Sequence, residues 1–247
     1  MGGQTVLRVS KQRSKKMSLV QEQVLAADLK KRWSELFSCS HSATSENLST
    51  AASHLIGAYQ QPSRHYHRLG HLLMMRAELG LSNTTDGPNL DFKDKRGVEL
   101  AIDVHDIVQG LIPTFDVSDS ERWVLTLLQA WGIDPQKEFL SLLPCLRATE
   151  HHPDKPPTTS DAKLVADADL AILGQTDIVY QKYAAGVSKE FGWVPEELFI
   201  RERIKVLNGF IKRPQIYWTD YFGELYEEKA RQNISKELLE LNEALRE

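Results

Sequence analysis

Cysteine is scarce in this chain, which has only Cys39 and Cys145 among 247 residues. Two cysteines make neither a disulfide framework nor a four-ligand zinc motif. They are typical of a reducing compartment, where we expect both to be idle thiols. The expected location is therefore the cytoplasm.

Long apolar runs and a strong net charge are also missing. No segment approaches the roughly 18 consecutive apolar residues that a membrane helix needs, so we expect no membrane partner. The net charge of −4 gives no general attraction to nucleic acid or anionic lipid. We therefore expect no nucleic-acid polymer as a partner, and a phosphorylated ligand would need a local cationic site.

Acidic residues are absent from residues 1–19, which carry five lysines and arginines. We expect a disordered basic arm here, followed by a single domain over residues 20–247. An extension upstream of an alternative start at Met17 is one alternative. A targeting peptide is another, but the segment lacks a clear amphipathic period. The sequence does not indicate the oligomeric state.

Alternating strand patterns are absent as well, whereas apolar residues recur every three or four positions, which is typical of amphipathic helices. We expect helices over residues 20–37, 45–59, 64–79, 95–108, from 118 or 119 onward, 135–143, 178–191, 195–211 and 220–245, with an apolar segment at 163–173 that contains two aspartates. The sequence therefore predicts an all-α fold packed around one core.

Histidine and aspartate gather at four places along this pattern. His67 and His71 stand four residues apart, so a helix would project both from one face, about 6 Å apart. His105 and Asp106 are adjacent inside an apolar run, and two further pairs follow: His151 with His152, and Asp167 with Asp169.

Each pair alone is explained by a hydrogen-bonded core histidine or a solvated helix face. Together they favour a metal, because aspartates embedded in apolar segments need a partner for their charge. Imidazoles and carboxylates suit a divalent ion such as Mn, Fe, Mg or Zn.

The order His71, His105-Asp106, Asp169 resembles the H…HD…D signature of the HD-domain metal-dependent phosphohydrolases. Further segments resemble one mostly uncharacterised subgroup of about 200 residues: Arg64-His-Tyr-His-Arg-Leu-Gly-His-Leu72, Ser120-Glu-Arg122, Thr149-Glu-His-His152, Asp167-Ala-Asp-Leu-Ala-Ile-Leu-Gly174, Arg203-Ile-Lys-Val-Leu207, Arg213-Pro-Gln-Ile-Tyr217 and Ala230-Arg-Gln-Asn233. The resemblance covers about residues 20–245 and implies an HD-domain-like helical bundle.

The resemblance also implies roles for individual residues. His71, His105, Asp106 and Asp169 would bind the metal, with Asp167 as the rival for the last position. His67 resembles the proton-donating histidine of cyclic-nucleotide phosphodiesterases and would act as the general acid. Glu121 would orient a ligand histidine from outside the metal's own ligand set.

Five side chains are candidates for holding the substrate phosphate, either as cations or as neighbours of the metal: Arg64, His151, His152, Arg203 and Arg231. An arginine fork matches paired oxyanions, although a surface salt bridge is the alternative for each arginine. The subgroup usually carries aromatic residues just before the HD pair and an acidic or aromatic continuation after it. Here Gln109 and Gly110 follow, which we expect to alter the rim of the pocket.

The leading hypothesis is a metal-dependent phosphohydrolase. Metal-bound hydroxide would attack a phosphoester or pyrophosphate bond of a small phosphorylated compound, with a nucleotide as the first expectation. The principal alternative is a non-catalytic HD-fold module that senses a nucleotide. A helical scaffold without a site and an oxygenase on the same scaffold are less favoured, since the former needs four accidental clusters and the latter more ligands.

Overall fold

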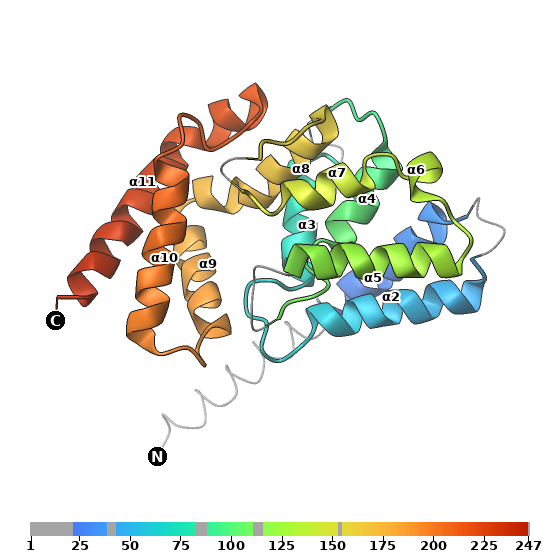
Figure 1. Cartoon of the computed structure of the whole chain (residues 1–247), viewed down its shortest axis with the longest axis horizontal. Helices are drawn as coiled ribbons and strands as arrows, with labels where there is room; N and C mark the ends of the chain where they lie inside the picture. Colours follow the sequence, from blue (N-terminus) through green and yellow to red (C-terminus); the bar gives the residue numbers. More distant parts are fainter. Residues whose placement is uncertain (1–21, 39–42, 83–87, 111–115, 153–154, 247) are drawn as a thin grey trace, which may run out of the picture.

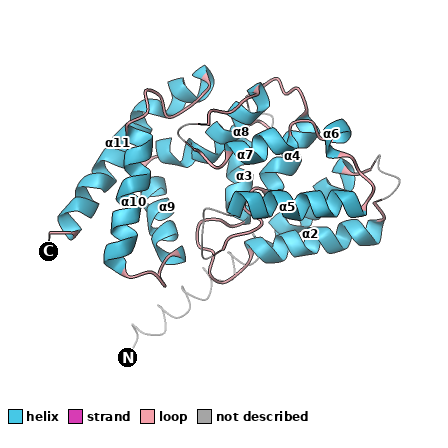
Figure 2. Ribbon diagram, in the orientation of Figure 1, coloured by secondary structure: helices cyan, strands magenta, loops and turns pink. Residues whose placement is uncertain are grey.

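The computed structural model describes residues 22–38, 43–82, 88–110, 116–152 and 155–246, and these form helices joined by loops (Figure 2). No strand occurs in these ranges, so the predicted all-α class is confirmed there. The expected basic arm at residues 1–19 and Cys39 lie outside the described residues. Cys145 is a buried free thiol.

A first helix spans residues 22–36. The others are α2 (Ser45–Tyr59), α3 (Leu69–Glu78), α4 (Lys95–Val104), α5 (Asp116–Ala130), α6 (Pro135–Glu138), α7 (Leu142–Ala148), α8 (Ser160–Leu170), the short 3-10 helix η2 (Ala171–Gly174), α9 (Asp177–Glu190), α10 (Glu196–Ile211) and α11 (Asp220–Ala244). Among them, no helix is long and apolar enough to cross a membrane.

Helix α4 lies at the centre of the larger group of helices, and α9, α10 and α11 form a second group beside it (Figure 1). Contacts join α4 to α3, α5, α7 and α8, and η2 packs against α11. The helix is buried almost throughout, because its residues Val98, Leu100, Ala101, Ile102 and Val104 are inaccessible to solvent. Its carboxyl end therefore places the following residues at the interior of the molecule.

A buried charged contact fixes the first helix to this centre. Asp103 of α4 accepts a hydrogen bond from Nε1 of Trp33 at 3.0 Å and another from Nη2 of Arg76 at 2.8 Å. All three side chains are buried. Removing one partner of such a pair leaves a buried charge uncompensated, which costs about 3–5 kcal/mol. This contact therefore stabilises α4 against both the first helix and α3.

Side-chain caps explain where several helices begin. Thr44, Asp94, Thr159 and Thr219 each precede a helix and accept a hydrogen bond from a backbone N–H in its first turn. A helix leaves its first N–H groups without partners, and such caps satisfy them. The predicted boundaries of α2, α9, α10 and α11 agree with the structure to within two residues.

Three predicted helices were wrong in extent. The helix expected from residue 64 begins only at Leu69, the helix expected to reach residue 108 ends at Val104, and the segment 135–143 is split between α6 and α7. The first two errors lie at the candidate site. The helices are shorter than expected because hydrogen bonds to other elements hold the backbone at both places.

Candidate metal centre

Four side chains from three parts of the chain converge on one point. His71 lies in α3, His105 and Asp106 follow α4, and Asp169 lies in α8. Nε2 of His71 is 3.1 Å from Nε2 of His105 and 3.0 Å from Oδ1 of Asp169. Oδ2 of Asp106 is 3.0 Å from Nε2 of His105 and 3.7 Å from Nε2 of His71. The four residues that the sequence singled out as ligands are thus neighbours in space.

The spacing of these atoms fits one divalent ion. Ligand atoms ~2.1 Å from an ion lie roughly 3.0 Å apart when their bonds are perpendicular and roughly 4.2 Å apart when they are opposite. The separations above fall within this interval, as does the 3.8 Å between Nε2 of His105 and Oδ1 of Asp169. The buried group of His71, His105 and Asp106 can therefore hold a metal ion.

The end of α4 orients His105 toward this point. His105 caps the helix, and its Nδ1 lies 2.9 Å from the carbonyl oxygen of Ile102. A histidine whose Nδ1–H donates to a backbone carbonyl presents Nε2 as its free ligand atom, which is the usual arrangement around metal ions. The hydroxyl of Tyr59 accepts a hydrogen bond from the backbone N–H of Asp106 at 3.2 Å and holds the next residue in place.

Arg64 is not available for the predicted contact with phosphate. Its side chain is buried, and its guanidinium donates to the carbonyl oxygens of Asp106 at 2.6 Å, Ile107 at 3.0 Å and His67 at 3.3 Å. Buried backbone carbonyls need hydrogen-bond partners, and Arg64 supplies them to the segment that follows α4. Arg64 therefore ties the segment before α3 to the end of α4.

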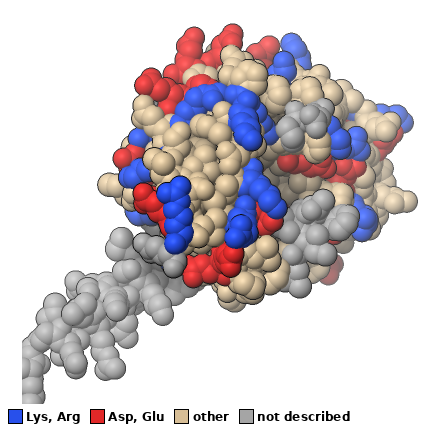
Figure 3. Space-filling model, turned by 60° about the vertical axis from the view of Figure 1, so that its left-hand side comes forward, with Lys and Arg blue, Asp and Glu red and all other residues tan. Residues whose placement is uncertain are grey.

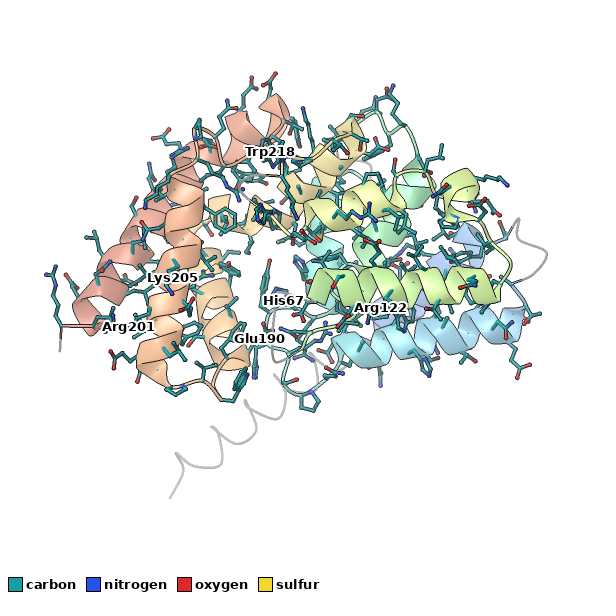
Figure 4. The ribbon with its side chains drawn as sticks, viewed as in Figure 1. His67, Arg122, Glu190, Arg201, Lys205 and Trp218 are labelled. Atoms are coloured by element: carbon teal, nitrogen blue, oxygen red, sulfur yellow. The ribbon has the colours of Figure 1, made fainter. Side chains whose placement is uncertain are left out.

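His67 lies outside α3 and is held by a residue from the far end of the chain. Its Nδ1 is 2.7 Å from Oε2 of Glu190, the last residue of α9. The other carboxylate oxygen accepts backbone N–H groups from His65, Tyr66 and His67 at 2.7, 2.7 and 3.0 Å. These N–H groups point to a carboxylate rather than to helical carbonyls, which explains why no helix forms at residues 65–67. Figure 4 shows His67 and Glu190 close together between the two groups of helices.

The expectation that His67 and His71 share one helical face was consequently wrong, although their rings remain close, with centroids 5.8 Å apart. Nε2 of His67 lies 4.0 Å from Oδ2 of Asp106, at the edge of the cluster. Helix α9 approaches this segment closely at Gly186, where a Cβ atom would lie 3.2 Å from Cβ of Tyr66.

His151 extends the cluster through Asp169. Its Nε2 lies 2.8 Å from Oδ2 of Asp169, and its carbonyl oxygen accepts a hydrogen bond from Arg213. Its φ of 50° lies in the left-handed region, which non-glycine residues adopt rarely and which is enriched at functional sites. Of the two histidines that the sequence offered, His151 reaches the cluster and His152 is exposed.

Asp167 has a different role from Asp169. It is buried and accepts hydrogen bonds from the backbone N–H groups of Trp218 and Thr219, both at 2.8 Å, and from the Thr219 hydroxyl at 2.6 Å. Burial raises the pKa of Asp167 to about 6, against the opposing effect of these hydrogen bonds. Its carboxylate therefore fixes the turn before α11, where Figure 4 labels Trp218, and both of its oxygens are engaged there.

Three other predicted site residues form ion pairs elsewhere. Glu121 pairs with Arg147, with separations of 2.7 and 2.9 Å, so it does not orient a ligand histidine. Arg231 donates to Glu227 and to the carbonyl of Ile211. Arg203 pairs with Glu237, its Nε lying 2.8 Å from Oε1. Of these three, only Arg203 lines the cavity beside the cluster.

The protonation of the cluster follows from its charges. Burial alone would lower the pKa of His105, but the adjacent Asp106 outweighs burial and raises it to about 9. Burial lowers the pKa of His71, against the effect of Asp169. Burial would raise the pKa of Asp169, but hydrogen bonds from His151 and His71 hold it well below its usual range. Two ionised carboxylates thus face His105, and a divalent cation can replace its proton because imidazole ligands bind metals in the neutral form.

Sequence reasoning missed Glu190, which lies 123 residues from His67 and follows an ordinary helical pattern. It also missed Gln109 as a contact, whose Nε2 lies 3.2 Å from Oε2 of Glu190. No local signal distinguishes Glu190, and Gln109 stood out only as a departure from the subgroup, expected at the rim of the pocket. Comparisons with protein-family models, curated proteins and solved structures find no match to this chain.

Proposed function

We propose that this chain is a metal-dependent phosphohydrolase with an HD-domain-like helical bundle. The observation that supports this most is the convergence of His71, His105, Asp106 and Asp169 at separations of 3.0–3.8 Å. These residues come in the order of the HD signature, and each lies where a shared ion could contact it.

The donor set decides which chemistry is available. A divalent cation bound by two imidazoles and two carboxylates supplies Lewis acidity at a phosphoryl oxygen and lowers the pKa of a water molecule. The chain's own residues hold that position: the end of α4 presents His105 and Asp106, and His151 fixes the second oxygen of Asp169.

His67 is placed for proton transfer to the leaving group. Glu190 occupies its Nδ1, so Nε2 remains on the side of Asp106 and of the adjoining cavity. Burial alone would lower the pKa of His67, but Asp106 and Glu190 outweigh burial and raise it. A protonated imidazole in this position is suited to act as a general acid.

Elemental analysis of the purified protein tests the metal centre. We expect near-stoichiometric Mn, Fe, Mg or Zn in the wild type, measured after reconstitution, and its loss in His105→Ala. His54→Ala is the matched control, because His54 is exposed on α2, away from the cluster. Equal metal in all three proteins would refute the assignment.

A panel of phosphomonoesters, phosphodiesters and pyrophosphates then tests the reaction. We expect the metal-loaded wild type and His54→Ala to hydrolyse at least one class, and His105→Ala to lose the activity. Ligand-dependent thermal stabilisation without any turnover would instead favour the non-catalytic nucleotide sensor. Full hydrolysis by His105→Ala would exclude the proposed site.

A further inference from the structure

A cavity of about 780 Å³ opens directly beside the cluster. His67, His151 and Asp169 belong to its lining, and most of the other lining residues come from η2, α9 and α10. Ligand sites of ≈ 300–1,000 Å³ are typical of proteins that bind small molecules. The cavity therefore has room for the organic part of a substrate whose reacting group lies at the cluster.

Apolar and aromatic side chains make up most of this lining. They include Tyr66, Tyr183, Phe191, Trp193, Leu198 and Val206. On the side of the molecule that carries α9–α11, Figure 3 shows an area of uncharged side chains bordered by basic and acidic ones. Trp193, Leu198 and Val206 remain 59%, 49% and 51% exposed, and exposed apolar side chains gathered at a cavity mark a binding site.

Positive charge is scarce in the same cavity. Among the described residues that line it, Arg203 is the one arginine or lysine. Its guanidinium contacts Glu237 at 2.8 and 3.2 Å and the Tyr183 hydroxyl at 3.1 Å, so its donors are largely engaged. Glu202 also lines the wall, and its carboxylate accepts a hydrogen bond from Lys205 at 2.6 Å, so this pair adds no net charge.

Cations near the cavity do not add free positive charge to its wall. Arg201 and Lys205 of α10 do not line the cavity, and each pairs with a glutamate one turn away or less (labelled in Figure 4). A triphosphate chain carries several negative charges that need cationic partners when they leave water. The described wall offers no set of free cations for them.

We propose, on the basis of the function proposed above, that the substrate is a phosphate ester whose organic group is uncharged and aromatic or aliphatic. The phosphoryl group would lie at the cluster and the organic group in the cavity, between α10 and η2. Burial of the apolar surface of this organic group would supply most of the affinity. This inference narrows the nucleotide expected from sequence, because it disfavours a nucleoside triphosphate and favours a phosphate ester with a more apolar organic group.

Steady-state kinetics with 1-naphthyl phosphate, glycerol 2-phosphate and ATP test this substrate class. We expect kcat/KM for 1-naphthyl phosphate to exceed the values for the other two by at least about tenfold, because only its organic group is large and apolar. The variant Leu198→Asp places a charge in the cavity wall and should raise KM for 1-naphthyl phosphate by about tenfold, with little change for glycerol 2-phosphate.

Leu225→Asp is the matched control, because Leu225 lies on α11, does not line the cavity and is 51% exposed against 49% for Leu198. Both proteins should retain the wild-type thermal midpoint. Similar kcat/KM for all three esters, unchanged in Leu198→Asp, would overturn this inference while leaving the phosphohydrolase intact.

Calorimetric titration with 1-naphthyl phosphate distinguishes a failure of the cavity assignment from a failure of the proposed phosphohydrolase activity. Suppose that no ester is hydrolysed, but that the wild type binds 1-naphthyl phosphate and Leu198→Asp does not. This result would support the cavity as the binding site and refute the proposed phosphohydrolase activity. If neither protein binds it, the cavity assignment falls as well.

Discussion

Oε2 of Glu190 lies 2.7 Å from Nδ1 of His67, although 123 residues separate them in the chain. The same carboxylate accepts three consecutive backbone N–H groups through its other oxygen. Helix α9 thus fixes both the backbone path before α3 and the ring nitrogen that His67 presents to the cluster. Glu190 is a positioning residue for the proposed general acid.

Replacing Glu190 with glutamine should reduce hydrolysis without removing the metal. An amide side chain can still accept the backbone N–H groups, but its charge and its acceptor for the His67 ring are lost. Substitutions of such orienting partners typically cost 10–100-fold, and we expect kcat to fall by about that factor. The measurement is kcat beside metal content; unchanged kcat with full metal occupancy would exclude the positioning role.

The same carboxylate makes stability depend on pH. Burial would raise the pKa of Glu190, but hydrogen bonds from His67 and from the backbone outweigh burial and lower it to about 2. The pKa of Glu190 is thus lower in the folded protein than in the unfolded chain, where it is about 4.5. The ionised carboxylate therefore stabilises the folded protein at pH values above about 4.5, and this stabilisation is lost as the pH falls toward 2. We expect Glu190→Gln to be less stable by about 1–3 kcal/mol at pH 7.

This difference should be roughly halved between pH 5 and pH 3, because the unfolded carboxyl then takes up its proton while the folded one stays largely ionised. Urea denaturation of both proteins at pH 7, 5 and 3 measures it. A difference that stays constant over this range would show that the ionisation of Glu190 does not contribute to stability.

Helix positions followed from the sequence because amphipathic periodicity and caps are local. Thr44 and Thr219, for example, mark the starts of α2 and α11 through their own side chains. The segment at residues 64–68 could not be derived in this way, since its conformation depends on Glu190 and on the carbonyls that Arg64 contacts. The four-residue spacing of His67 and His71 suggests a helix there, and tertiary hydrogen bonds impose a different backbone path.

The residues of the candidate site fall into the same two groups, those that local sequence identifies and those whose role depends on the fold. His71, His105, Asp106 and Asp169 were found because hard-to-bury residues stood out within apolar runs and matched a known order. Arg64, Arg203 and Arg231 also stood out by chemistry, but an arginine's partners are set by the fold. All three donate to carbonyls or glutamates of this chain.

Asp167 and Asp169 should respond differently to the same substitution. Asp169→Asn removes a charged oxygen that lies 3.0 Å from Nε2 of His71, and we expect the bound metal to be lost. Asp167→Asn weakens the hydrogen bonds to Trp218 and Thr219 and should leave metal content unchanged while lowering stability by about 1–3 kcal/mol. Elemental analysis and urea denaturation of both variants check this; metal loss in Asp167→Asn alone would reverse the assignment.

Gly97 should be essential to the start of α4, and therefore to the position of His105 at its end. A Cβ atom there would overlap Oδ2 of Asp94 and lie 3.0 Å from the backbone nitrogen of Leu142. Asp94 caps α4 through Gly97 N–H at 2.9 Å and also accepts the N–H of Ser141 at 2.9 Å, which joins α4 to the start of α7. Gly97→Ala should displace this cap and destabilise the protein by about 1–3 kcal/mol.

The matched control is Gly209→Ala in α10, where a Cβ atom would meet nothing within 4 Å. Alanine exceeds glycine in helix propensity by about 1 kcal/mol, so this variant should be as stable as the wild type or more so. Opposite signs of the two changes in unfolding free energy are therefore expected from one chemical substitution. If Gly97→Ala were also stabilising, the close packing of α4 against α7 at Asp94 would be refuted, together with its part in positioning His105.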